Sequence, residues 1–212
     1  MNGPFDTIRA RPDEVAAQRL GDDIVTEADV VMDRAFTVTT APERAWSWLL
    51  QLGKQRAGWY LPRSLERFVP RSRRPARTII AVWRHLEVGD VVPDYGGKNE
   101  SFQVAILQPP SALVYRSQRG HMQVSWSITL TVLPDSGVDA PLLTRIHLRL
   151  RLGSVRRKWL VNTAGELLDI LTIAVMAAGL RERLTDNPRP VASDHRRGCV
   201  RRGIPGCRRN DR

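Results

Sequence analysis

Cysteine is scarce in this sequence, which contains two among its 212 residues, Cys199 and Cys207. His195 lies near them, but these three side chains do not complete the four-ligand set of a structural zinc site. The sequence therefore predicts no metal, no cofactor and a core that forms without cross-links. No apolar segment follows Met1, so we expect no secretory signal. We accordingly predict a cytoplasmic protein in which both thiols stay reduced.

Lysine is scarce as well: three of the 33 basic residues are lysines, at Lys54, Lys98 and Lys158, and the rest are arginines. The formal net charge is +11, and the segment from Arg181 to Arg212 holds +6 of it, from ten arginines and four acidic residues. A basic excess that gathers near one end and is otherwise scattered gives salt-sensitive, non-specific attraction to polyanions. We therefore expect no specific nucleic-acid partner.

The local motifs of common catalytic sites are missing, since the sequence has neither a nucleophile elbow nor a glycine-rich phosphate loop. A general acid or base needs a neighbour that shifts its pKa, and no such partner accompanies Asp90 or Asp94 in the sequence. Long apolar runs are missing too. The uncharged stretch from Ile170 to Leu180 has 11 residues, whereas crossing a bilayer takes about 20. These absences leave catalysis open and predict no membrane-spanning helix.

Apolar and polar residues alternate at a period of two in the second half of the chain. The alternation is regular from Val124 to Val132 and from Ile146 to Leu152. It predicts two strands with one dry and one wet face, and the wet face of the second would turn His147 and its neighbouring arginines toward water. Weaker patterns predict five further strands, at about 30–38, 78–83, 86–93, 102–106 and 113–115.

Helical periodicity is found in three segments. Pro42 begins a short helix that ends at Gly53, and a second short helix is predicted from Trp59 to Phe68. From Val155 to Leu184 the period is helical throughout. We expect the buried stripe of this last helix to consist of Leu160, Ala164, Leu167, Leu171, Val175 and Ala178.

This order of elements predicts an α+β domain at 30–184, preceded by a partly disordered extension at 1–29 and followed by a basic, disordered tail at 185–212. A curved, seven-stranded antiparallel sheet with one dry face needs a cover, and the long C-terminal helix is the element that can lie across its concave face. Two short helices follow the first strand. Where a curved sheet and a helix do not fit closely, an apolar cavity opens between them.

Three stretches resemble the START-like superfamily, which includes polyketide cyclase/dehydrase and lipid-transport proteins. They are APERAWSWL at 41–49, QLGKQRAGWY at 51–60 and VGDVVP at 88–93, and the second is similar to actinobacterial branches of the superfamily. The likeness spans about 30–184. It implies a helix-grip fold, and the superfamily's functions range from lipid and hormone carriers through aromatase/cyclases to chaperone activators. These motifs mark the fold and carry no catalytic constellation.

Candidate ligand-binding residues are apolar or aromatic side chains on the dry strand faces, on the final helix and beside the arginine-rich loop at 69–77. For each of them, plain core packing is the competing interpretation, as it is for Trp126 against the final helix. Tyrosines among them could orient a polar ligand tip. The candidates for the cavity lining are Trp59, Tyr60, Tyr95, Phe102, Val104, Tyr115, Trp126, Ile128, Leu148, Leu167 and Leu171.

The leading functional hypothesis is the binding or carrying of an apolar small molecule of lipid, polyketide or aromatic type. A first alternative is an enzyme of the polyketide cyclase/dehydratase type, acting through Asp94, Tyr95 or Tyr115. A second alternative is an interaction module in which the apolar half of the final helix docks a protein or a membrane. Weak contact with anionic membrane fits basic residues beside Trp159, at 156–158.

Overall fold

The computed structural model describes residues 6–97, 99–134, 141–156 and 158–186. Six strands form one antiparallel sheet in the order β1-β6-β5-β4-β3-β2. The strands are β1 Val30–Thr39, β2 Val91–Pro93, β3 Ser101–Gln108, β4 Ala112–Arg119, β5 Met122–Val132 and β6 Leu143–Gly153. The predicted disordered tail lies outside the described residues from residue 187 onward, and so do both cysteines.

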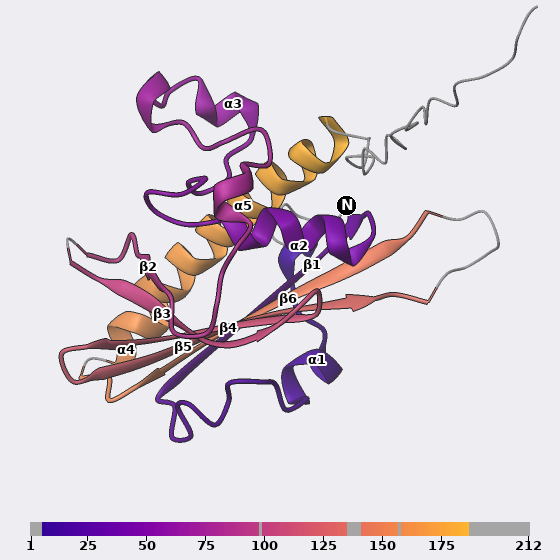
Figure 1. Cartoon of the computed structure of the whole chain (residues 1–212). Helices are drawn as coiled ribbons and strands as arrows, with labels where there is room; N and C mark the ends of the chain where they lie inside the picture. Colours follow the sequence, from indigo (N-terminus) through magenta and orange to yellow (C-terminus); the bar gives the residue numbers. More distant parts are fainter. Residues whose placement is uncertain (1–5, 98, 135–140, 157, 187–212) are drawn as a thin grey trace, which may run out of the picture.

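Helices lie on both faces of this sheet (Figure 1). The long helix α5, Glu166–Asp186, and the helix α2, Pro42–Gln51, cover one face, while α1, Pro12–Ala16, lies on the other. The remaining short elements are η1 Asp6–Ile8, α3 Arg63–Glu66, η2 Arg71–Arg73, η3 Ala81–Trp83, α4 Lys158–Leu160 and the π-helical turn η4 Val161–Gly165. An antiparallel sheet under a long C-terminal helix is an α+β architecture consistent with the helix-grip fold.

The sheet has six strands, so the predicted count of seven was wrong. The predicted strand that does not form is the segment rich in β-branched residues at 78–83. Its backbone is extended at Ile80, but the backbone groups there bond to the Gln51 side chain instead of a neighbouring strand. The fully buried Gln51 accepts a hydrogen bond from the Ile80 N–H at 2.9 Å and donates one to the Thr78 carbonyl at 3.2 Å. The amide group of one glutamine thus satisfies backbone groups that a neighbouring strand would otherwise take.

The second short helix is also shorter than predicted. The prediction ran from Trp59 to Phe68, whereas α3 occupies Arg63–Glu66. Pro62 explains the late start, because a proline disfavours helical backbone at the residue before it. Trp59 and Tyr60 therefore lie in a segment without regular secondary structure, which passes close to α5 at Gly179.

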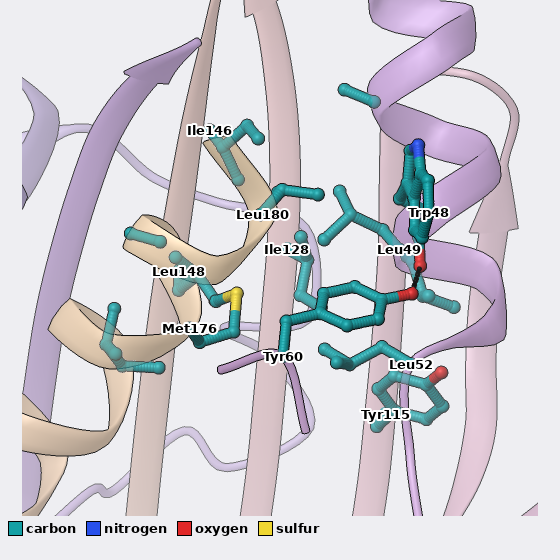
Figure 2. Packing of buried hydrophobic residues seen from close by; sticks show 14 of the residues in the cluster. Trp48, Leu49, Leu52, Tyr60, Tyr115, Ile128, Ile146, Leu148, Met176 and Leu180 are labelled. Atoms are coloured by element: carbon teal, nitrogen blue, oxygen red, sulfur yellow. Dashed lines mark hydrogen bonds between the residues drawn. The ribbon is translucent and has the colours of Figure 1, made fainter. Parts of the chain in front are cut away.

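The core lies between α2, α5 and the sheet, as Figure 2 shows. Trp48 of α2 meets Tyr60 edge to face with ring centroids 5.5 Å apart, and the Tyr60 hydroxyl donates to the Trp48 carbonyl at 2.7 Å. Ile128 of the sheet and Met176 and Leu180 of α5 pack around this pair, all of them buried.

The buried face of α5 differs from the predicted stripe. Leu167 and Leu171 are 57% and 43% exposed. The residues that α5 buries are Ile173, Met176, Ala177, Gly179, Leu180, Arg183 and Leu184. Because the helix is apolar around most of its circumference, hydrophobic periodicity does not determine which side faces the sheet.

The rotation of α5 is instead determined near its C-terminal end, by Arg183. This side chain is 0% exposed, and it donates hydrogen bonds to the carbonyls of Ala76, Leu61 and Gly179 at 2.8–2.9 Å. It also donates to the Glu66 carboxylate at 2.7 Å. One buried cation therefore joins the helix to the chain on either side of α3.

The opposite face of the sheet is covered by residues 6–29, and the expectation that its arginines face water was wrong. Arg145 binds Glu14 through two 2.8 Å hydrogen bonds. Arg149, 4% exposed, donates to backbone carbonyls of the covering segment, including that of Val15 at 2.6 Å. Arg151 donates to the carbonyl of Val25 at 2.9 Å. The alternating polar side chains of β6 thus bind the N-terminal segment.

His147 is buried on the same face, at 3% exposure. Its Nε2 lies 3.0 Å from Oδ1 of Asp33, a carboxylate that also accepts a hydrogen bond from Arg149 at 2.8 Å. The expectation that His147 points to water fails for the same reason as for the arginines, because sequence alternation identifies a polar strand face but not what covers it.

By length and composition alone, one helix among the described residues, Thr163–Asp186, is long and apolar enough to cross a membrane, because it contains an 18-residue segment with a mean hydropathy of 1.6. The prediction of no membrane-spanning helix considered only the uncharged stretch from Ile170 to Leu180, whereas this test tolerates two charged residues within the segment. Core helices that cover the sheet of a folded domain pass the same test. In this helix 28% of the 18-residue apolar segment is buried.

Replacing Gly179 by alanine should destabilise the protein, although alanine is the better helix former by about 1 kcal/mol. A Cβ atom there would lie 2.7 Å from backbone atoms of Tyr60 and Leu61, and overpacking of this kind costs about 1–3 kcal/mol. Denaturant unfolding of Gly179→Ala measures the change, with Thr185→Ala on the exposed side of the same helix as control. A gain in stability for Gly179→Ala would contradict the close approach.

Acid should loosen the N-terminal segment through Glu14. The hydrogen bonds from Arg145 hold the pKa of Glu14 at about 2, below its ordinary value of 4.5. A carboxylate with a lowered folded-state pKa stabilises the fold above the unfolded pKa, and that contribution is lost as the pH falls from about 4.5 toward 2. Unfolding free energy measured across this range should fall less steeply in Glu14→Gln than in the wild type. Equal slopes would contradict the Arg145–Glu14 contact.

Candidate ligand-binding cavity

A cavity of about 550 Å³ opens between the sheet and the N-terminal half of α5. Its sheet side includes Met32 of β1, Trp126 of β5 and Leu150 of β6, and its helix side includes Leu168 and Ile173. The dry face of the sheet places these strand side chains here, because each belongs to the inward-facing set of its strand. The loop that follows β2 and the turn η4 contribute to the remaining rim.

Five aromatic rings that contact one another lie beside the cavity, and four of them, all except Tyr115, line it. We call the five rings the aromatic wall: Trp59, Tyr95, Phe102, Tyr115 and Trp126. Trp126 is at the centre, with ring centroids 5.7 Å from Tyr115 and Phe102 and 6.2 Å from Trp59. Tyr115 and Trp126 are direct cross-strand partners of β4 and β5, and their rings stack at 21°. The register of the sheet therefore assembles most of the wall.

Trp59 joins the wall to the helix. It comes from the extended chain before α3, its ring stacks on Trp126 at 28°, and its Nε1–H donates to the Thr172 carbonyl of α5 at 3.1 Å. Tyr95 meets the Trp59 ring edge to face at 6.5 Å. The wall thus spans sheet, loop and helix.

The structure brings together some of the sequence-predicted lining residues. Trp59, Tyr95, Phe102 and Trp126 line the cavity, and Tyr115 stands in the wall beside a small adjoining pocket. Leu167 and Leu171 are exposed on the outer side of α5. The others belong to the buried core and do not line the cavity: Tyr60, Val104, Ile128 and Leu148.

Sequence reasoning missed several lining residues, among them Leu150, Leu152 and Met32. The alternation of β6 carried the signal for the first two, since they share a strand face with Leu148. Sequence reasoning also missed the charged lining residues Asp169 and Arg119. An acidic residue in the first turn of a helix resembles an ordinary surface residue, so the sequence gives no sign of its position.

One charged group lies at the rim formed by the loop after β2. Arg119 of β4 pairs with Asp94 and lies 3.7 Å from Glu100, and its guanidinium lies 5.1 Å from the Phe102 ring centroid. Asp94 also accepts a hydrogen bond from the Tyr95 N–H at 2.7 Å. These partners hold the loop against the aromatic wall.

The second charged group is Asp169 of α5, whose side chain is 16% exposed. Its Oδ2 lies 2.9 Å from Nε of Arg34, and Nη2 of the same arginine lies 3.5 Å from Glu166. Burial raises the pKa of Asp169, the Arg34 charge opposes that change, and the nearby Glu166 adds to it. The result is a carboxyl group in an apolar cavity whose pKa is above its ordinary value.

No protein-family model matches the chain, and no curated protein matches it in sequence. Similar solved structures include a protein from Mesorhizobium loti, with 16% identity over 74% of this chain and 98% of that one at a TM-score of 0.43. A START-superfamily protein from Mycobacterium smegmatis matches with 14% identity over 73% and 98% at a TM-score of 0.41. The Aha1 protein from Colwellia psychrerythraea matches with 12% identity over 72% and 98%, also at 0.41.

At these identities and TM-scores the similarity does not assign the chain to a family, a ligand or an activity. A START-superfamily protein is among the similar structures, while the actinobacterial branch stays a prediction.

Proposed function

We propose that this protein binds and carries an apolar, ring-containing small molecule in the cavity between the sheet and α5. The observation that carries this proposal is the aromatic wall on one side of an apolar cavity of about 550 Å³. Small-molecule sites are concave, mostly apolar and about 300–1,000 Å³ in volume.

The chemistry of the wall favours a flat ligand. A ring that stacks on Trp126 or Trp59 gains about 0.5–1.5 kcal/mol beyond the burial of its area. Aliphatic side chains such as Leu150, Ile173 and Leu168 line other parts of the cavity and offer no hydrogen bond to the rings of a ligand. The ring portion of the ligand is therefore recognised mainly by its shape and by stacking of its flat faces on the tryptophan rings.

Carriage is favoured over catalysis by the state of the candidate catalytic groups. Burial raises the pKa of Tyr95 and of Tyr115, so both hydroxyls stay protonated near neutral pH and serve poorly as bases. Asp94 is engaged by Arg119 and by the Tyr95 N–H. The cyclase/dehydratase alternative needs one of these groups to be released when the substrate binds.

Filling the cavity tests the proposal. Leu150→Trp places an indole in the cavity from β6, so pyrene, a flat apolar fluorophore, should bind at least about tenfold more weakly than to the wild type, a loss of about 1.4 kcal/mol. Fluorescence titration of pyrene measures this, and native mass spectrometry of freshly purified protein asks which apolar molecule co-purifies. Leu143→Trp, at an exposed position of the same strand, should bind pyrene normally. Absence of pyrene binding to the wild type would overturn the proposal.

A second candidate function, contact with a membrane surface, is supported by one patch. Its members are Leu167, Leu168 and Leu171 on neighbouring turns of α5, which are 57%, 63% and 43% exposed. Trp159 of α4, shortly before them in the chain, is 69% exposed. Large exposed apolar groups that gather in one place mark interaction surfaces. Leu168 also lines the cavity, so the patch borders the proposed ligand site, and the exposed Arg156 lies near it in the chain.

The patch predicts binding to lipid vesicles. Leu167→Ser with Leu171→Ser removes two exposed leucines that do not line the cavity, and it should weaken co-sedimentation with phosphatidylcholine/phosphatidylglycerol vesicles several-fold, since each buried leucine contributes about 1.5–3 kcal/mol. The control is Leu20→Ser with Leu65→Ser, two leucines exposed to 41% and 40% elsewhere. Equal binding of both double variants would contradict a role of the patch.

A further inference from the structure

Two arginines, one that lines the cavity and one that contacts a lining residue, each lie close to two carboxylates. Arg34 lies 2.9 Å from Asp169 and 3.5 Å from Glu166; we call these three residues the Arg34 cluster. Arg119 pairs with Asp94 and lies 3.7 Å from Glu100; these three form the Arg119 cluster. One residue of the first cluster, Asp169, and two of the second, Arg119 and Asp94, line the cavity.

In both clusters the carboxylates outnumber the cations. Each contains one guanidinium and two carboxylates, so each carries a net charge of −1 when all groups are ionised. Among the described lining residues, Arg119 is the one cation, and its charge is already matched by Asp94. A ligand carboxylate entering the cavity would therefore meet excess negative charge in a poorly solvated space, which is unfavourable.

One carboxylate oxygen of Asp169 is available to accept a hydrogen bond. Its Oδ2 is buried, yet it has no well-directed hydrogen bond, because the nearby Arg34 N–H does not point at it despite the 2.9 Å separation. Neighbouring donors are committed elsewhere: the Thr172 hydroxyl donates to the Leu168 and Asp169 carbonyls, and Trp59 Nε1 donates to the Thr172 carbonyl. Buried polar atoms are generally hydrogen-bonded, and a donor on a ligand would supply the well-directed hydrogen bond that the Arg34 ion pair does not give this oxygen.

We infer that the cavity selects apolar ring compounds whose polar end donates hydrogen bonds or is cationic, a hydroxyl or an ammonium, and that it rejects acids. This inference rests on the proposed function, since it assigns the polar end of the molecule that the aromatic wall would hold. The apolar rings lie against Trp126 and Trp59, and the donor end reaches the Asp169 carboxylate of the Arg34 cluster or Asp94 of the Arg119 cluster.

A matched series of pyrene derivatives tests the inference on the intact protein. Pyrene, 1-pyrenemethanol, 1-pyrenemethylamine and 1-pyrenecarboxylate share the same ring system and differ in one polar group. At neutral pH the alcohol and the ammonium should bind at least about tenfold more tightly than the carboxylate, as charge complementarity in a desolvated site requires. Fluorescence titration gives all four dissociation constants.

Substitution then locates the source of the selection. Asp169→Asn keeps the size of the side chain and removes its charge, so the ratio of the ammonium affinity to the carboxylate affinity should fall by about fivefold or more. Asp94→Asn should lower the same ratio and serves where Asp169→Asn is too unstable. Glu43→Gln is the matched control, because it removes one exposed carboxylate from α2, a helix that contributes no lining residue.

The outcomes separate the two proposals. Equal wild-type affinities for the carboxylate and the ammonium would overturn the selection of donors while leaving the ring-binding cavity in place. A ratio that Glu43→Gln changes as much as Asp169→Asn would overturn it too, because net charge alone would then explain it. Failure of all four compounds, pyrene included, would overturn the proposed function and the inference together.

Discussion

The arrangement of the domain depends on one fully buried guanidinium, that of Arg183 near the end of α5. An unpaired charge at this depth would cost several kcal/mol, and Arg183 avoids that cost through three carbonyls and the Glu66 carboxylate. The partners outside α5, at Leu61, Glu66 and Ala76, are within reach of Arg183 only when this side of the helix faces them. A helix that is apolar around most of its circumference therefore acquires a defined face toward the sheet, and the position of Ile173 and Asp169 at the cavity follows from it.

The two faces of the sheet are covered by different physical means. On the α5 side, apolar side chains and close backbone contact at Gly179 exclude water. On the other side, Arg145 and Arg149 reach from β6 to a carboxylate and backbone carbonyls of residues 6–29. The regular alternation of β6 serves both faces at once, so this central strand links the core, the cavity lining at Leu150 and the N-terminal segment.

The sequence was most informative where a pattern has one structural solution. Alternation located the ends of β5 and β6 within three residues, and Trp126 and Phe102 were placed on the inward face because a strand has only two faces. It failed where a side chain replaces a regular element, as Gln51 does for the absent strand. It also failed for Asp169, since its role depends on the rotation of α5, which long-range contacts of Arg183 determine.

The indole of Trp59 has a mechanical consequence for the cavity. It stacks on the sheet through Trp126 and holds the backbone of α5 through a single hydrogen bond to the Thr172 carbonyl. Breaking one such bond costs about 0.5–1.5 kcal/mol, little more than thermal energy. The loop before α3 is therefore joined to the N-terminal half of α5 by one weak polar contact, whereas Arg183 joins the C-terminal half to its surroundings through a charged group with several partners.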